Sequence, residues 1–525
     1  MSQEAEKRSA ESLGSTVSTV IVMICTAASR LFGYVRQALF NYYFGASGAA
    51  DALNAVFNIP NNLRKLFAEG AFSAAFIPVL SSTLAEDPTR QRSQALVQTL
   101  IALELCVLLP LVALSLAFPR ALVTMLFAFQ DPGKVAVAAT LMRWTFNYVL
   151  FVSLGALVMA VLNTHGRFTI PALSPLLFTL PTVLSLIFFH GRLGILAMGV
   201  GVLVGGILQL AFQIPAFRGQ GYRFKVSFHF ANSDFVRTAR LWIPYLAAAS
   251  IVTINQFVAQ FFATGLDDGS VSALTNAVMF LQIPIGIFTT SVATVTFPTM
   301  SRQVASGETE ALRGTVAYGI NFLLVLLVPS SILLCVLGRE IIAATLQRGH
   351  FTSTNTLMAA RTLTGYAIGL VSMGIYTFLQ KLFNSYKTFV VPLASAALIA
   401  VIDIILSLIL KETPLRVSGL AYANSIAFTV GMLFLAYLAR RRLGGIGIRS
   451  IILTLGKSML GSLPMAVLLV AFLSWKPDLW LHGGSLRATA LVAAVVLASV
   501  GLTIGMYLLL RVPFLADLIS RRRKK

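Results

Sequence analysis

Residues 163–174, NTHGRFTIPALS, are echoed by residues 384–395, NSYKTFVVPLAS. Both runs fit the pattern N-x4-F-x2-P-x2-S, and their starting positions differ by 384 − 163 = 221 residues. Chance similarity between two apolar segments is the alternative, but the shared positions hold Asn, Pro and Ser and not only Leu and Val. The match therefore indicates an internal repeat.

The composition is that of a membrane protein. Of the 525 residues, 57% are hydrophobic and only 11% are charged, and a soluble domain could not bury so much apolar surface. Apolar stretches long enough for a span of about 20 residues recur along the chain. We predict an all-α polytopic fold of fourteen transmembrane helices, near residues 13–40, 52–84, 94–117, 135–162, 170–190, 193–215, 234–263, 270–300, 312–337, 355–383, 388–410, 416–439, 451–474 and 486–510.

The repeat and the helix count together predict the domain organisation. Six helices per repeat is an even number, so the two copies share one orientation and are related by a pseudo-two-fold axis along the membrane normal. We expect an N-lobe at 1–220 with spans one to six and a C-lobe at 221–442 with spans seven to twelve. Residues 443–525 hold the last two helices and a basic tail.

The net charge of +21 comes from 40 Lys and Arg against 19 Asp and Glu. In a soluble protein this excess would suggest a nucleic-acid partner, but here the charges lie between apolar runs. With both termini inside, the inner loops carry more than twice as many basic residues as the outer loops, as the positive-inside rule requires. We therefore expect contact with anionic lipid head groups and no nucleic acid.

Seven basic residues fall at or near membrane depth, where each costs about 2.5–3.5 kcal/mol unless it faces water or a partner. They are Arg30, Arg36, Arg64, Lys65, Arg143, Arg361 and Lys457. The first four belong to the first two spans, so the amino-terminal half is expected to supply the positive wall of a central path. A guanidinium group can donate two parallel hydrogen bonds to the oxygens of one phosphate. The arginines therefore favour a diphosphate ligand over a drug-like cation.

Less specific interpretations exist for some of these cations. Lys65 and Glu69 have the i, i+4 spacing of a simple ion pair. Arg64, Lys65, Arg143 and Lys457 could extend to the membrane interface. Arg30 and Arg36 are six residues apart and would face one cavity only through a bend, for which Gly33 is placed. Asp51 is the carboxylate expected to pair with one of the arginines while the site is empty.

Asp403 and Ser407 lie one turn apart in the eleventh span and form a candidate site for Na⁺ or a proton, with a structural hydrogen bond as the alternative. Signatures of catalysis and of ATP binding are missing from the sequence, and the His and Cys residues lack metal-ligand spacing. We expect a transporter without covalent catalysis or cofactor, driven by Na⁺, by H⁺ or by the membrane potential.

Three runs resemble the MurJ/MviN lipid II flippases of the multidrug and oligosaccharidyl-lipid exporter superfamily. They are SRLFGYVR at 29–36, PNNLRKLFAEGAFS at 60–73 and NTHGRFTIP at 163–171. The resemblance implies two six-helix lobes, a central cationic cavity that opens alternately to either side, and a terminal helix pair with a groove for the lipid tail. It carries the family's essential arginines onto Arg30, Arg36 and Arg64.

The family aspartate matches Asp51. Three positions depart from the family pattern, since Met279, Gln37 and Ala259 stand where members carry Arg, Asp and Asp respectively. The last departure leaves Na⁺ coupling open, although Asp403 matches a retained acidic position.

The resemblance implies a flippase in the bacterial inner membrane, with both termini cytoplasmic. The substrate would be lipid II, the undecaprenyl-diphosphate-linked sugar-peptide used for the cell wall. Membrane lipids and cell-wall synthesis enzymes are the implied partners of a monomer. A flippase for another undecaprenyl-linked oligosaccharide remains an alternative. A cation-coupled drug exporter would need acidic residues in the amino-terminal cavity, and a scaffold would have no use for charges at membrane depth.

Overall fold

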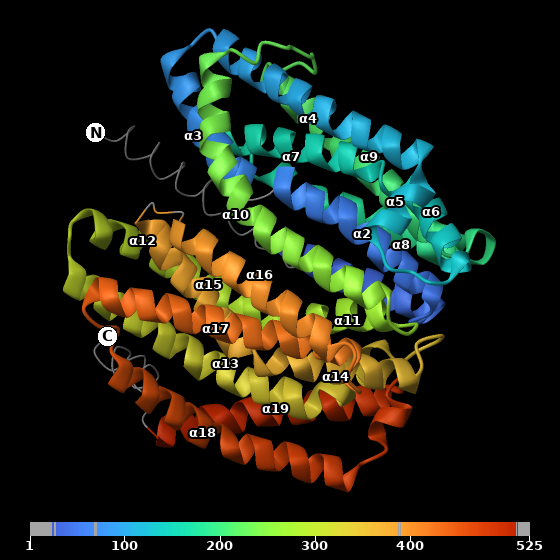
Figure 1. The fold of residues 1–525 in the computed structure, drawn as a ribbon, viewed down its shortest axis with the longest axis vertical. Coiled ribbons are helices and arrows are strands. Elements are labelled where there is room, and N and C mark those ends of the chain that lie inside the picture. The colour runs from blue at the N-terminus through green and yellow to red at the C-terminus, as the bar shows by residue number, and fades with distance from the viewer. Residues whose placement is uncertain are drawn as a thin grey trace, which may run out of the picture. The chain divides into compact units, whose positions relative to one another are not determined.

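The computed structural model describes residues 24–25, 28–67, 71–386, 388, 390–510 and 512. Within these residues the regular secondary structure is entirely helical (Figure 1). The all-α fold predicted from composition is confirmed.

Ten helices in the described part are long and apolar enough to cross a membrane. An eleventh span forms when α14 (Ser353–Ile368) and α15 (Leu370–Ser385), which meet at an angle of 49°, are counted together. The remaining predicted spans, 13–40, 52–84 and 234–263, are helical wherever the structure describes them. The chain is therefore a polytopic membrane protein, in agreement with the hydropathy pattern.

One compact unit comprises the residues up to Phe44 together with Gly48–Thr253. Residues 28–44 form its first described helix. Its other helices are α2 (Gly48–Phe67), α3 (Ala71–Glu86), α4 (Gln91–Ala117), α5 (Pro119–Leu126), α6 (Pro132–Thr145), α7 (Tyr148–Thr164), α8 (Thr169–Leu193), α9 (Leu196–Gly219) and the first part of α10 (Ser233–Thr264). Apolar side chains of α3, α4 and α7 form its core, with Phe72 edge-on to Trp242 of α10 at 5.8 Å between ring centroids.

The other unit comprises Gly45–Ser47 and Ile254 onward. Its helices are the rest of α10, α11 (Ser270–Pro284), the π-helical turn η1 (Ile285–Thr289), α12 (Thr290–Ala305), α13 (Thr309–Leu346), α14, α15, α16 (Val390–Leu410), α17 (Val417–Leu443), α18 (Ile448–Trp475), the short η2 (Leu479–His482) and α19 (Leu486–Leu509). Helix α18 packs against α13, and α19 packs against α18 (Figure 1). The three-part division predicted from the sequence stays a prediction.

The repeat motif occupies the same place in both units. It joins the end of α7 to the start of α8 in one unit and the end of α15 to the start of α16 in the other, and its proline is the third residue of the second helix in both. Its serine is buried in both copies: Ser174 accepts a hydrogen bond from Gln213 at 2.7 Å, and Ser395 lies 3.1 Å from the hydroxyl of Tyr376. The two prolines and serines thus have matching structural roles.

Candidate functional site

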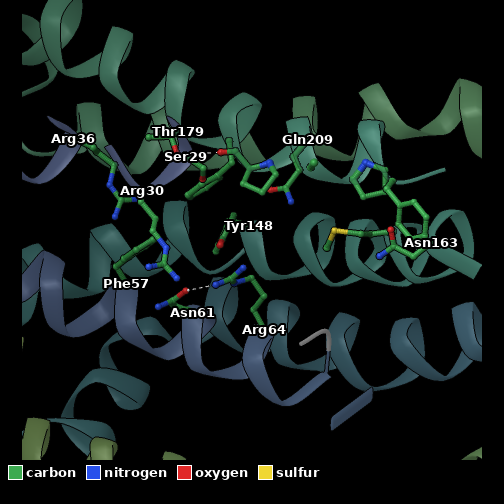
Figure 2. A pocket seen from close by; sticks show the side chains of 16 residues that line it. Ser29, Arg30, Arg36, Phe57, Asn61, Arg64, Tyr148, Asn163, Thr179 and Gln209 are labelled. Carbon is green, nitrogen blue, oxygen red and sulfur yellow. Dashed lines mark hydrogen bonds between the residues drawn. The ribbon is translucent and has the colours of Figure 1, made fainter. Parts of the chain in front are cut away.

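The amino-terminal unit contains a cavity of about 760 Å³ that Arg30, Arg36 and Arg64 line together. Figure 2 shows the three guanidinium groups pointing into this pocket from two helices. Its other lining residues are aromatic, amide-bearing or small: Ser29, Phe57, Asn61, Tyr148, Met159, Asn163, Phe168, Pro171, Ala172, Pro175, Phe178, Thr179 and Gln209. None of the described lining residues is acidic, so the wall is positive without an internal counter-charge.

Helix α2 presents one face to the cavity. Phe57, Asn61 and Arg64 follow one another at i, i+4 and i+7, which places their side chains above one another on the same side of a helix. The guanidinium of Arg64 donates to the amide oxygen of Asn61 at 3.2 Å. That bond fixes the direction of the arginine side chain along the cavity wall.

Arg36 is held between aromatic rings. Its guanidinium carbon lies 5.6 Å from the ring centroid of Phe57 and 5.9 Å from that of Phe178. Its Nε is buried and finds no hydrogen-bond partner in the described part of the chain. Arg36 and Arg64 also repel each other electrostatically. An anion bound between them would relieve this repulsion and accept hydrogen bonds from their guanidinium groups.

Arg30 is exposed and belongs to the same helical stretch, 28–44, as Arg36. Both side chains reach the cavity despite their six-residue spacing. No atom of the described residues lies within 4 Å of the position that a β-carbon on Gly33 would take. The bend proposed at Gly33 stays a prediction.

Sequence reasoning missed the aromatic and amide part of the site. The i, i+4, i+7 series that leads to Arg64 on α2 could have revealed Phe57 and Asn61. Nothing comparable points to Tyr148 or Gln209, because both come from other helices and reach the cavity only through the packing of α7 and α9 against α8.

Other predicted site residues are placed differently. Asp51 lies buried in the first turn of α2 and is not among the residues that line the cavity, so its role stays a prediction. The backbone of Lys65 belongs to α2, but its side chain, like Glu69, lies outside the described residues. Arg143 is exposed near the end of α6. Arg361 and Lys457 line two separate pockets of the carboxy-terminal unit.

Asp403 and Ser407 do come together, at the junction of three helices. The Asp403 carboxylate accepts hydrogen bonds on Oδ2 from the amides of Asn255 at 2.7 Å and Asn424 at 2.8 Å. The Ser407 hydroxyl is 3.3 Å from Oδ1. The described residues contain no cluster of three or more His, Cys, Asp or Glu. The geometry shows the structural hydrogen bonds, while the cation site stays a prediction.

Comparison with known proteins decides the family. The sequence model of the family described as "Lipid II flippase MurJ" matches residues 40–509. The chain belongs to the MurJ family. It is 30% identical over 462 residues to "Probable lipid II flippase MurJ" of Borreliella burgdorferi, covering 88% of this chain and 90% of the relative. The relative of the same name from Vibrio cholerae is 30% identical over 430 residues, with 80% and 81% covered.

Solved structures agree with this assignment. A structure described as "Lipid II flippase MurJ, inward closed conformation" has a TM-score of 0.78 and 26% identity, covering 95% of this chain and all of that one. An inward-facing multidrug resistance MATE family transporter of the MOP superfamily has a TM-score of 0.65 at 14% identity, covering 79% of this chain and 94% of its own. The second likeness concerns the fold alone.

The three departures from the MurJ family pattern lie on different helices. Gln37 is buried one residue after Arg36. Met279 and Ala259 are partly exposed, on α11 and α10. None of the three is among the residues that line the arginine cavity.

Proposed function

We propose that this chain translocates lipid II from the inner to the outer leaflet of the bacterial cytoplasmic membrane, in cell-wall synthesis and without covalent catalysis. The observation that carries the proposal is a cavity with three arginines and no acidic side chain among its described lining residues. A cation exporter needs the opposite charge. An anion with phosphate oxygens fits the donors that are present.

The remaining lining suits the rest of such a head group. Amide groups of Asn61, Asn163 and Gln209 can bond sugar hydroxyls and peptide groups. The volume of about 760 Å³ lies within the usual range of roughly 300–1,000 Å³ for ligand sites. The arginines would bind the diphosphate that lipid II shares with other undecaprenyl-linked oligosaccharides, so discrimination between these lipids falls to the amide-bearing residues of the cavity.

Transport then needs the cavity to open alternately to the two sides while the polyprenyl tail stays in lipid. With both termini cytoplasmic and the cell interior negative, outward movement of an anion is favoured by about 2.3 kcal/mol per charge per 100 mV. The membrane potential alone can therefore bias the cycle. The chain would act as a monomer among membrane lipids and pass its substrate to enzymes of cell-wall synthesis.

Coupling to an ion is the second part of the proposal. Asp403, Ser407, Asn255 and Asn424 offer oxygen atoms, which is the donor type that Na⁺ and protons require. Rotation of the two amides would turn their oxygens towards Asp403 around a cation. Flipping that depends on Na⁺ or on a pH gradient in the wild type, and no longer depends on it in Asp403→Asn, would support this role.

The main test uses purified protein in vesicles that carry lipid II in one leaflet, with the appearance of the lipid in the other leaflet as the readout. Arg36→Ala should abolish flipping, and Arg36→Lys should restore only part of it because lysine lacks the two-pronged geometry. Arg143→Ala, which removes an exposed arginine of the same unit, is the matched control and should flip normally. Normal flipping by folded Arg36→Ala protein would refute the role proposed for the arginines.

A second lipid in the same assay separates the alternatives. An undecaprenyl-linked oligosaccharide of different sugar composition should be moved slowly or not at all. Equal rates for both lipids would make the chain a general flippase for polyprenyl-diphosphate sugars.

A further inference from the structure

A second cavity, of about 420 Å³, lies within the carboxy-terminal unit. None of the helices that line the arginine cavity contributes to it. Its walls come from α11, α14, α17 and the turns that precede α11 and α17. Two arginines, Arg361 and Arg416, line it together with one carboxylate, Asp267. On the orientation predicted from the basic loops, this end of the unit faces outward.

Arg361 lacks a partner for its charge among the residues that the structure describes. It is exposed on α14, eight residues after the helix begins, which is about 12 Å along the helix axis. Within the described part of the chain its guanidinium group makes no ion pair and no hydrogen bond. A cation at this depth in a polytopic protein is expensive unless it faces water or a ligand.

Arg416 is only weakly neutralised. Its Nε lies 3.8 Å from Oδ2 of Asp267, and both side chains are more than half exposed, at 56% and 66%. Exposed pairs at such a distance contribute less than about 1 kcal/mol. The cavity therefore keeps a net positive charge, and the second arginine can turn from the aspartate to a stronger anion.

Hydroxyl groups complete the lining. Ser270, Thr354, Ser418 and Tyr422 all face this cavity, and their hydroxyls make no hydrogen bond among the described residues. Ser270 and Ser418 also stand at the starts of α11 and α17, where the helix dipole favours negative charge. Gly365 on α14 allows this close grouping, because a β-carbon there would lie 2.9 Å from that of Ala421 on α17.

We propose that this cavity is a second binding site, for a phosphate or diphosphate group. Two guanidinium groups with several hydroxyl donors match an anion that has many acceptor oxygens, and a phosphoryl group has more of these than a carboxylate. The group can belong to the head of a translocated lipid or to an outer-leaflet phospholipid. If the site also helps to release the translocated head group, that role rests on the proposed flippase function. The binding of a phosphate group does not depend on it.

The test is hydrogen exchange, resolved by mass spectrometry, on the full chain in phosphatidylcholine nanodiscs. Millimolar pyrophosphate should slow exchange in the peptides that cover residues 266–274 and 411–423. The double variant Arg361→Gln, Arg416→Gln should lose this protection. Arg487→Gln, which removes an exposed arginine from the start of α19, is the matched control and should keep it.

Two further arms separate the sources of phosphate and the two sites. Protection without pyrophosphate in phosphatidylglycerol nanodiscs assigns the site to a phospholipid head group, and protection that appears only with pyrophosphate assigns it to a soluble or translocated group. Protection should persist in Arg36→Ala, which disables only the amino-terminal cavity. Unchanged exchange in both lipids, or equal protection in the double variant, would overturn the proposal whatever the outcome of the flipping assay.

Discussion

The guanidinium carbon of Arg36 lies 5.6 Å from the centroid of the Phe57 ring, and the arginine makes no ion pair among the described residues. Aromatic rings hold a cation in place through their negative faces without neutralising it. The polar edge of Arg36 is thereby kept for a ligand. A carboxylate in the same place would position the side chain equally well but would compete with the substrate.

Phe57→Leu tests this relationship, because leucine keeps an apolar side chain but removes the π face. A cation–π contact contributes about 0.5–1 kcal/mol or more, so the affinity for a diphosphate-bearing lipid should fall roughly two- to fivefold. Lipid binding in nanodiscs measures this change. Phe76→Leu, in the core of the same unit, should lower stability and leave the affinity unchanged.

Part of this site was within reach of the sequence, and part was not. The arginines could be found because a charged residue within a membrane-spanning segment is costly, whatever the segment packs against, and so it stands out in the sequence. Phe178 could not be distinguished from an ordinary core residue, because an apolar ring has the same sequence signal whether it packs on leucine or on a guanidinium. The repeat could be recognised from the sequence because its Asn, Pro and Ser mark a turn between two helices. Such a turn depends on neighbouring residues in the chain and not on distant packing.

Arg92 joins the start of α4 to the start of α10 through a two-bonded ion pair with Asp234. The distances are 3.2 Å from Nε to Oδ2 and 2.9 Å from the second guanidinium nitrogen to Oδ1. Asp234 is buried, so Arg92→Gln should lower the unfolding midpoint by leaving the Asp234 carboxylate without its cation. Glu86→Gln removes only the exposed partner of Arg92 and should cost less than about 1 kcal/mol. Thermal unfolding in detergent compares the two, and equal losses would contradict the prediction.

His165, in the turn after α7, predicts a dependence of stability on pH. Its Nε2 lies 3.1 Å from the Tyr222 hydroxyl, and burial, with a smaller contribution from Arg90, lowers the pKa of His165. The unfolded chain, with a pKa near 6.5, therefore binds a proton more readily than the folded one. Stability should fall as pH drops below about 7 and level off below the folded-state pKa. His165→Gln should flatten this part of the profile, measured as unfolding midpoints between about pH 7.5 and about pH 5.5.

Glu104, on α4, is buried, and neither of its carboxyl oxygens has a hydrogen-bond partner among the described residues. A buried polar group in this condition costs about 1–3 kcal/mol, so Glu104→Leu should stabilise the fold by a similar amount. Unfolding measurements give the change, and the flipping assay shows whether activity survives. Loss of flipping in a stabilised variant would reveal a transport role for the carboxyl group that its surroundings do not indicate.

Gly205 lies at the contact between α8 and α9, two helices that contribute residues to the wall of the arginine cavity. A β-carbon at this position of α9 would press on the backbone carbonyl of Phe178 on α8, and backbone cannot move aside as a flexible side chain can. Gly205→Ala should therefore push α8 away from α9, costing about 1–3 kcal/mol in overpacking. Because Phe178 lies against Arg36, the same shift should loosen the arginine and slow flipping.

Gly191→Ala is the matched control on α8, since no atom in the described part of the chain lies within 4 Å of the added carbon. Alanine is favoured over glycine within a helix by up to about 1 kcal/mol, so this variant should be slightly more stable and fully active. Unfolding midpoints and flipping rates of the two variants together separate a helix-propensity effect from a packing effect. If Gly205→Ala proved as stable and as active as Gly191→Ala, the close approach of α8 and α9 would not be what positions Phe178 against Arg36.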